Sequence, residues 1–136
     1  MHLRPVSEAG KGPRAASQEL GELGERIAEK WLARTGWTVL ARRWRSGRRD
    51  VDLIVHRGGV VAFVEVKARR GLGFGDPAES VHWRKRRELT RSALAWIDRY
   101  GMDGLEYRFD VLAVLLHGGR VRVRHLEDAF PMHSPH

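Results

Sequence analysis

The sequence predicts an α/β protein with a mixed central sheet of about five strands flanked by helices. Residue patterns follow the order helix, three strands, helix, two strands, an alternation typical of helices packed on a mixed sheet. The chain has 136 residues, 42% hydrophobic and 31% charged, which is enough for one domain with one core. We expect this domain to span residues 18–127, between a disordered N-terminal tail (1–17) and a C-terminal tail (128–136).

The first predicted helix runs from Gln18 to about Arg34. Ser17 is a candidate N-cap, and Gly36 is expected just past the last turn. Glu25 falls at the edge of the apolar stripe of this helix, where it either reaches the interior or remains a solvated flanking residue. The stripe consists of Leu20, Leu23, Ile27, Trp31 and Leu32.

A first strand is predicted at Trp37–Trp44. A basic run then passes through a Ser-Gly turn into the next strand, and it forms either a strip that faces phosphate groups or a solvated loop. The run contains Arg42, Arg43, Arg45, Arg48 and Arg49.

The centre of the chain predicts a β-hairpin. Residues 50–55 and 60–67 are largely apolar and β-branched, which is typical of strands buried on both faces. The Gly-Gly pair at 58–59 separates them and is a hairpin signal. If the loop has two residues, Arg57 pairs with Val60. Each residue before Arg57 then faces the residue the same number of positions after Val60.

In this register, Asp52 lies opposite Glu65, and Asp50 lies opposite Lys67. Directly opposed residues point to the same face of the sheet, and like charges so placed repel each other. Ionisable groups inside apolar strands are costly unless they are paired or bound to a metal. A hard divalent cation between Asp52 and Glu65 would turn the repulsion into binding. The alternative is a buried salt bridge of Asp52, Glu65 and Lys67.

After this hairpin, residues 69–75 predict a mobile, basic loop of the kind that contacts substrates. The second helix is expected to begin with Asp76 as N-cap, Pro77 in the first position and Glu79 completing a capping box. It is predicted to run to about Tyr100. Its basic first half either follows a phosphate backbone or is a solvated face.

Two further strands are predicted, at Glu106–Leu116 and Arg120–Leu126, the second with the alternation of an edge strand. Asp110 lies inside the first of them, and we expect it to be structural and paired with Arg108 or another basic neighbour. The seven histidines have no metal-ligand spacing, so no zinc site is assigned.

Composition favours a polyanionic partner. The net charge is +8, the isoelectric point is about 10.9, and arginine dominates the positive residues. The chain has no cysteine, which fits a reducing cytoplasm. No apolar run approaches a transmembrane length, and residues 1–17 lack the apolar core of a secretion signal. We therefore expect a cytoplasmic protein that binds nucleic acid and not a membrane.

Several of these residues also match the sequence motifs of a known protein family. The order Asp52, then Glu65-Val66-Lys67, resembles the Asp…Glu-x-Lys core of the PD-(D/E)XK nuclease superfamily. More specifically, residues 20–116 look like the bacterial YraN-like family, which is related to archaeal Holliday-junction resolvases. The further matching residues are Gly21, Gly24, Glu25, Gly36, Trp37, Asp50, Leu53, Ile54, Lys85 and the segment Arg108–Val111.

The resemblance implies a restriction-endonuclease-like α/β/α fold and a metal-dependent endonuclease acting on DNA. Asp52 and Glu65 would hold Mg²⁺ or Mn²⁺, with the carbonyl of Val66 and, through water, Glu25. Lys67 would orient or help deprotonate the attacking water. The residues expected to contact nucleic acid are Arg43, Arg45, Arg48, Arg49, Arg69, Arg70, Arg84 and Lys85.

Two other readings remain at this point. The chain could be a catalytically inactive nucleic-acid-binding module of the same fold, or a protein-interaction domain whose basic loops contact an acidic partner. The substrate class is open among junction, flap, single-stranded DNA and RNA. A homodimer would fit junction cleavage, which needs two paired cuts.

Overall fold

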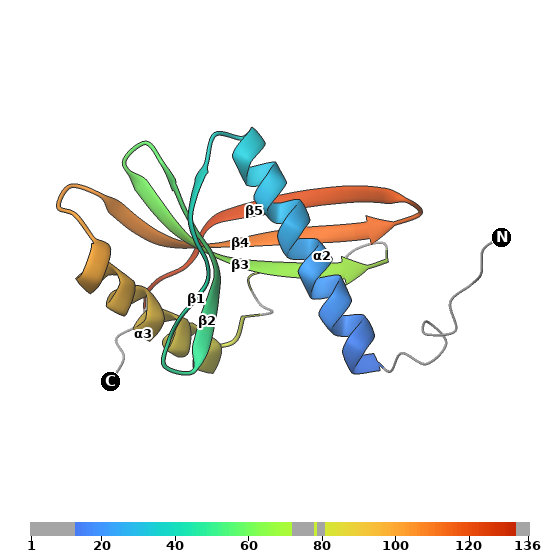
Figure 1. Ribbon diagram of the computed structural model, residues 1–136, viewed down its shortest axis with the longest axis horizontal. Coiled ribbons are helices and arrows are strands. Elements are labelled where there is room, and N and C mark those ends of the chain that lie inside the picture. The colour runs from blue at the N-terminus through green and yellow to red at the C-terminus, as the bar shows by residue number, and fades with distance from the viewer. Residues whose placement is uncertain (1–12, 72–77, 79–80, 133–136) are drawn as a thin grey trace.

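The computed structural model describes residues 13–71, 78 and 81–132. Within these residues the chain forms helix α2 and three strands, then helix α3 and two strands (Figure 1). The elements are α2 (Pro13–Arg34), β1 (Thr38–Ser46), β2 (Arg49–Arg57), β3 (Val60–Arg70), α3 (Trp83–Tyr100), β4 (Glu106–His117) and β5 (Arg120–Phe130). None of the described helices is long and apolar enough to cross a membrane.

The strands form one five-stranded sheet in the order β1-β2-β3-β4-β5. All neighbours are antiparallel except β3 and β4, which are parallel and are connected through α3. A parallel pair needs such a crossover because its second strand must start at the same end as the first. The mixed α/β sheet predicted from the sequence is therefore confirmed.

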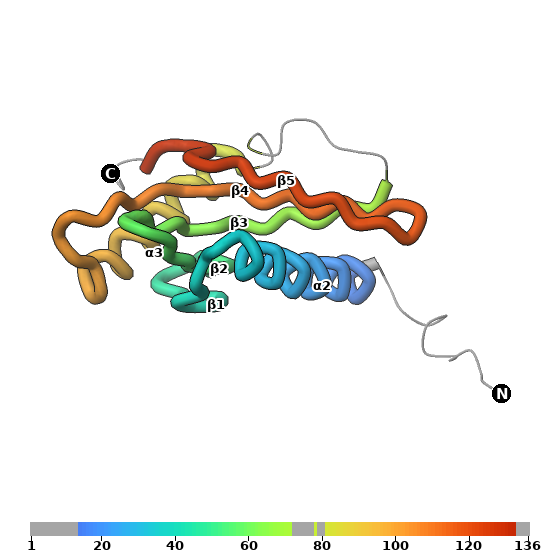
Figure 2. Tube along the Cα trace, turned by 90° about the horizontal axis from the view of Figure 1, so that it is seen from above, coloured from blue at the N-terminus to red at the C-terminus, as the bar shows by residue number. Residues whose placement is uncertain are grey.

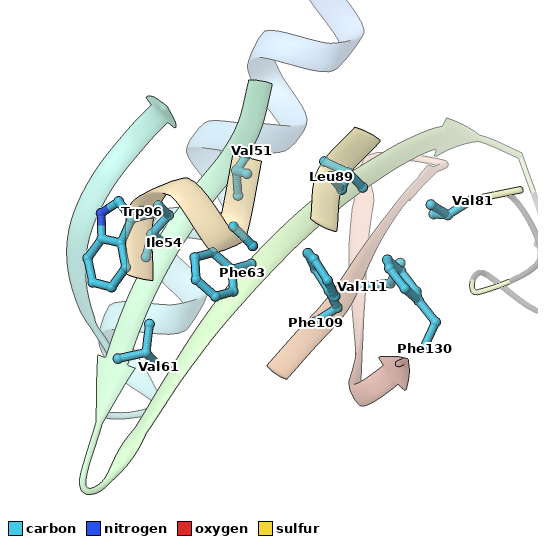
Figure 3. Close-up of a cluster of buried hydrophobic side chains, with 11 residues drawn as sticks. Val51, Ile54, Val61, Phe63, Val81, Leu89, Trp96, Phe109, Val111 and Phe130 are labelled. Atoms are coloured by element: carbon cyan, nitrogen blue, oxygen red, sulfur yellow. The ribbon is translucent and has the colours of Figure 1, made fainter. Parts of the chain in front are cut away.

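The sheet buries both of its faces, but against different helices. On one face, Phe63 lies at the centre of a cluster with Trp96 of α3 and Phe109 of β4 (Figure 3). On the other face, Leu32 of α2 packs with Leu53 and other strand residues. Each buried side chain of this size contributes about 1.5–3 kcal/mol. The continuous apolarity of β2 and β3 follows from this two-sided burial, as the sequence predicted.

Three element ends differ from the predictions. Helix α2 begins at Pro13, so the expected N-cap Ser17 lies inside the helix. Proline suits a first helical position, and the alanines that follow extend the helix readily. Strand β3 continues to Arg70 because it pairs with β4 as far as Leu116, so the first residues of the expected loop belong to the strand, and residues 72–75 lie outside the described residues. Strand β5 continues to Phe130, whose ring stacks on Phe109 with centroids 4.8 Å apart.

The predicted start of the second helix was wrong. Asp76, Pro77 and Glu79 lie outside the described residues, and α3 begins at Trp83 with His82 as its N-cap. The His82 backbone is extended (φ −76°, ψ 171°), and its ring accepts a hydrogen bond from the backbone N–H of Arg84. Because Val81 is fully buried in the core, the chain is anchored just before the helix starts.

Candidate functional site

The hairpin of β2 and β3 has the register that the sequence predicted. Arg57 pairs with Val60 across a two-residue loop, and the pairing continues in register to Leu53 and Val64. The next residues along the two strands are Asp52 and Glu65. The pairing ends at Leu53 and Val64, so neither the predicted pair Asp52–Glu65 nor the predicted pair Asp50–Lys67 belongs to the described ladder. Asp50 pairs instead with Arg45 of β1.

The carboxylate of Asp52 replaces backbone pairing at the end of this ladder. Its Oδ2 accepts a hydrogen bond from the backbone N–H of Val66 at 2.8 Å, which links β2 to β3. Burial and the nearby charge of Glu65 raise the pKa of Asp52 to about 8, although the Val66 N–H acts in the opposite direction. The two predicted acids are therefore neighbours, and burial, together with the charge of Glu65, favours the protonated form of Asp52 near neutral pH.

Two lysines compensate the charge of Glu65. Lys67 places its Nζ 3.8 Å from Glu65 Oε2, and the Nζ of Lys85, which comes from α3, forms an ion pair with the same oxygen. The Glu65 side chain is only 7% exposed, so both lysines reach into the interior to meet it. Burial, followed by the positive charge of Lys85, lowers the pKa of Lys67. Lys85 was predicted to contact nucleic acid, and the structure places it inside the acidic cluster.

Glu25 lies near this cluster but has its own partner. Its carboxylate accepts a hydrogen bond from Arg43 at 3.0 Å. Arg43 adopts a left-handed backbone conformation (φ 48°), which is uncommon for a residue with a Cβ. Glu25 still helps to raise the pKa of Asp52, so its charge is felt there. It lines a neighbouring cavity of about 390 Å³ together with Arg43 and Leu53, instead of the cavity that Asp52 and Glu65 share.

The cavity at the acid pair measures about 280 Å³ and is strongly polar. It is lined by Arg45, Arg48, Arg49, Asp50, Asp52, Glu65 and Lys85. Arg49 is held by Glu88 at 2.7 Å, and Arg45 lies 3.5 Å from Asp50. Four of the predicted nucleic-acid contacts, three arginines and Lys85, thus line the cavity with the predicted catalytic acids. This arrangement can receive a phosphate group beside two carboxylates.

The remaining predicted contacts lie elsewhere on the surface. Arg69 and Arg70 are exposed at the end of β3, and Arg84 lies over the ring of Trp83 at 5.5 Å on α3. Trp83 itself is 59% exposed, so it contributes little to the core. The guanidinium of Arg87 also lies over this ring, at 5.8 Å, so Trp83 is an exposed ring flanked by positive charge.

A second polar cluster lies on the opposite face of the sheet and was not predicted as a site. Asp110, His125 and Glu127 bring their ligand atoms within 4.8 Å of one another, a grouping that could hold a metal ion. The guanidinium of Arg108 already bridges Asp110 and Glu127, at 3.0 Å from each. The predicted Asp110–Arg108 pair is confirmed. His125 reaches this cluster because β5 pairs with β4, and the register of the two strands shifts beside Asp110. Its Nε2 lies 2.7 Å from Asp110 Oδ2.

Comparison with known proteins identifies the family. The model of the uncharacterised protein family UPF0102 matches residues 24–114. The chain belongs to this family. The matched segment contains Glu25, Asp52, Glu65, Lys67 and Lys85, whereas β5 lies outside it.

Individual relatives match over nearly their whole length. A UPF0102 protein of Rhodococcus jostii is 42% identical over 112 residues, which cover 82% of this chain and 95% of the relative. One from Alkaliphilus metalliredigens is 38% identical, covering 84% and 99%. One from Symbiobacterium thermophilum is 43% identical, covering 84% and 98%. These names assign no activity.

Proposed function

We propose that this protein is a metal-dependent endonuclease that hydrolyses phosphodiester bonds of DNA. The observation that carries the proposal is the neighbouring pair of half-buried Asp52 and buried Glu65, with Lys67 beside Glu65, at a cavity edged by arginines. The resemblance of Asp52 and Glu65-Val66-Lys67 to the PD-(D/E)XK core supports the same chemistry.

The residues at this cavity fit Mg²⁺ or Mn²⁺. Both ions prefer oxygen ligands, and Asp52, Glu65 and the backbone carbonyl of Val66 supply oxygens only. Burial and the charge of Glu65 raise the pKa of Asp52, and a cation bound between the two carboxylates would oppose both effects. When bound, such an ion would polarise a phosphoryl oxygen and lower the pKa of a water molecule.

Hydrolysis forms a bond from the water oxygen to phosphorus and breaks the ester bond, and the leaving oxygen takes up a proton. Lys67 is placed to stabilise the negative charge that develops on the phosphate. Its lowered pKa also makes it a more effective proton carrier near neutral pH. Arg45 and Arg48 would offset the repulsion between DNA and the acid pair.

The test is cleavage of branched, single-stranded and duplex DNA in Mg²⁺ or Mn²⁺. We expect Asp52→Asn and Lys67→Ala each to reduce the cleavage rate about 10²–10⁴-fold, the range for loss of a catalytic group. Asp50→Asn is the matched control, because Asp50 lines the same cavity but contacts Arg45 and not Glu65. Cleavage that survives both site substitutions would belong to another site or to a contaminant and would contradict the proposal.

A second candidate function is a catalytically inactive nucleic-acid-binding module. The ion pairs of Lys67 and Lys85 with Glu65 favour it, since they compensate part of the buried charge without a metal. Binding that weakens steeply with salt, with no cleavage in either metal, would support this function. Affinity for another partner that persists at high salt would favour protein recognition instead. A homodimer remains a proposal, which light scattering after gel filtration would test.

A further inference from the structure

The sheet face that carries Glu65 and Lys67 continues across β4 to β5. Strand pairing places Lys67 beside Ala113 and Ala113 beside Arg124. The next line of paired residues runs from Arg69 through Leu115 to Arg122, and His117 pairs with Arg120 at the end of the hairpin. Directly paired residues point to the same face. Arg120, Arg122 and Arg124, here called the arginine row, therefore lie on the face of the proposed site.

The alternate residues of β5 confirm this orientation. Val123 packs against the cluster under α2, and the ring of His125 lies 5.6 Å from Trp31 of α2. Since neighbouring residues of a strand point to opposite faces, the arginine row points away from α2. Figure 2 shows α2 on one side of β3 and β4, with no described helix opposite it over the far ends of these strands.

All three arginines of the row are exposed, and among the described residues none has a carboxylate partner. Arg120 and Arg122 line a cavity of about 440 Å³ with Leu115 and His117, and none of the described residues that line it is acidic. Alternate residues of an antiparallel strand are about 6.8 Å apart, so the row is a regular series of cations. Adjacent strands are about 4.8 Å apart, which puts Arg124 about 10 Å from Lys67 across the sheet.

We propose that the arginine row binds the phosphate backbone of a nucleic-acid strand and guides it from Lys67 across β4 and β5. This inference rests on the proposed function, because the path of the nucleic-acid strand is drawn from the proposed catalytic site at Lys67. Arginine suits the task because its planar guanidinium makes paired hydrogen bonds to phosphate oxygens. Contacts to phosphate oxygens carry no sequence information, so binding along the row should be independent of base sequence.

Charged residues on an edge strand also prevent the strand from pairing with the edge of another sheet, which is a second reason for arginines at these positions. Nucleic-acid binding by the arginine row must therefore be measured directly. The experiment follows the anisotropy of a fluorescent single-stranded DNA in EDTA over a salt series, with the full chain. For Arg122→Ala/Arg124→Ala we expect about tenfold weaker binding, and a salt slope smaller by about 1.4, the value for two lost phosphate contacts.

The matched control is Lys30→Ala/Arg34→Ala, which removes two exposed charges from α2. It should leave the slope near that of the wild type. A second variant, Arg122→Lys/Arg124→Lys, keeps the charge and should retain most of the slope, which separates electrostatic contact from damage to the fold. Equal losses in the row variant and the α2 control, or an unchanged row variant, would overturn the inference.

These outcomes are independent of catalysis. If no DNA is cleaved in any metal, a slope change confined to the row variant still establishes the surface. If cleavage depends on Asp52 but the row variant binds and cuts as the wild type does, the proposed function stands and the arginine row is refuted.

Discussion

Asp52 combines a structural role with its proposed chemical role. Its carboxylate accepts the Val66 N–H at the point where β2 and β3 stop pairing, so a buried donor would lose its partner if the oxygen were removed. Asparagine keeps that acceptor and removes the charge. Substitution by asparagine therefore tests the chemistry, whereas alanine would also disturb the hairpin.

The raised pKa of Asp52 predicts a specific pH dependence of stability. The native state keeps the proton between about pH 4, where an unfolded aspartate ionises, and about pH 8, so the free energy of unfolding falls as the pH rises through this range. Asp52→Asn removes this loss and should be more stable than the wild type near pH 8, by several kcal/mol.

Urea unfolding in EDTA at a series of pH values measures this difference directly. The wild type and Asp52→Asn should converge at acidic pH and separate as the pH rises. Parallel curves for the two proteins would mean that Asp52 ionises normally in the folded state.

Asp110 shows the opposite behaviour. Burial disfavours its charge, but hydrogen bonds from His125, Arg108 and the backbone N–H of Asp128 outweigh burial and lower its pKa. Its stabilisation is present above about pH 4 and is lost as the pH falls further. Asp110→Asn should cost about 3–5 kcal/mol because it leaves Arg108 without its buried partner.

Thermal unfolding at neutral pH tests this cost. Asp128→Asn is the matched control, since Asp128 is exposed and asparagine tolerates its left-handed backbone (φ 52°). EDTA should not change the melting temperature of the wild type if Arg108 fills the space between Asp110 and Glu127. A large destabilisation by EDTA would instead identify a metal at this cluster.

At the scale of elements, the contact of α2 with β3 positions the acidic edge of the helix. A Cβ at Gly24 would lie 2.6 Å from the Cβ of Ala68, which is closer than real carbon atoms approach. The helix can therefore sit against the strand only with glycine here. Because Glu25 is the next residue, this close approach also determines how near its charge lies to Asp52.

Gly24→Ala should consequently destabilise the protein by about 1–3 kcal/mol, the range for overpacking. Gly21→Ala is the control in the same helix, where an added Cβ meets nothing within 4 Å. That change should stabilise the protein by about 0.5–1 kcal/mol, because alanine favours a helix interior over glycine. Calorimetric melting temperatures should move in opposite directions, and two shifts of the same sign would refute the close contact.

Helix α3 connects the two halves of the sheet and serves both the core and the site. Its last turns place Trp96 against Phe63, with ring centroids 5.8 Å apart. Its first turns carry Lys85 to Glu65. The packing of Trp96 against Phe63 fixes α3 on the sheet, and this position of the helix brings Lys85 to Glu65.

At the scale of the whole molecule, the acidic residues of the proposed site are more buried than most arginines. Glu65 is buried and Asp52 is half-buried, whereas most of the described arginines are exposed. The full sequence has a net charge of +8. Helix α2 covers one face of β3, whereas α3 lies over β2 and β1, so the two helices cover different parts of the sheet (Figure 2). This offset leaves the arginine row exposed beside the proposed site.

The sequence alone determined the hairpin and its acid pair. A Gly-Gly loop of two residues and the two-residue period of strands are local rules, so the register that brings Asp52 to Glu65 needs no distant contact. The same locality explains why the fold class was predictable from the order of the elements.

Only the tertiary structure decided which distant residues join these elements. The insertion of Lys85 beside Glu65, the pairing of Glu25 with Arg43 and the meeting of His125 with Asp110 all depend on packing between separate elements. The parallel pairing of β3 with β4 likewise sets which face of β5 continues the site. Such contacts are chosen by burial and charge over the whole fold, which local residue patterns do not encode.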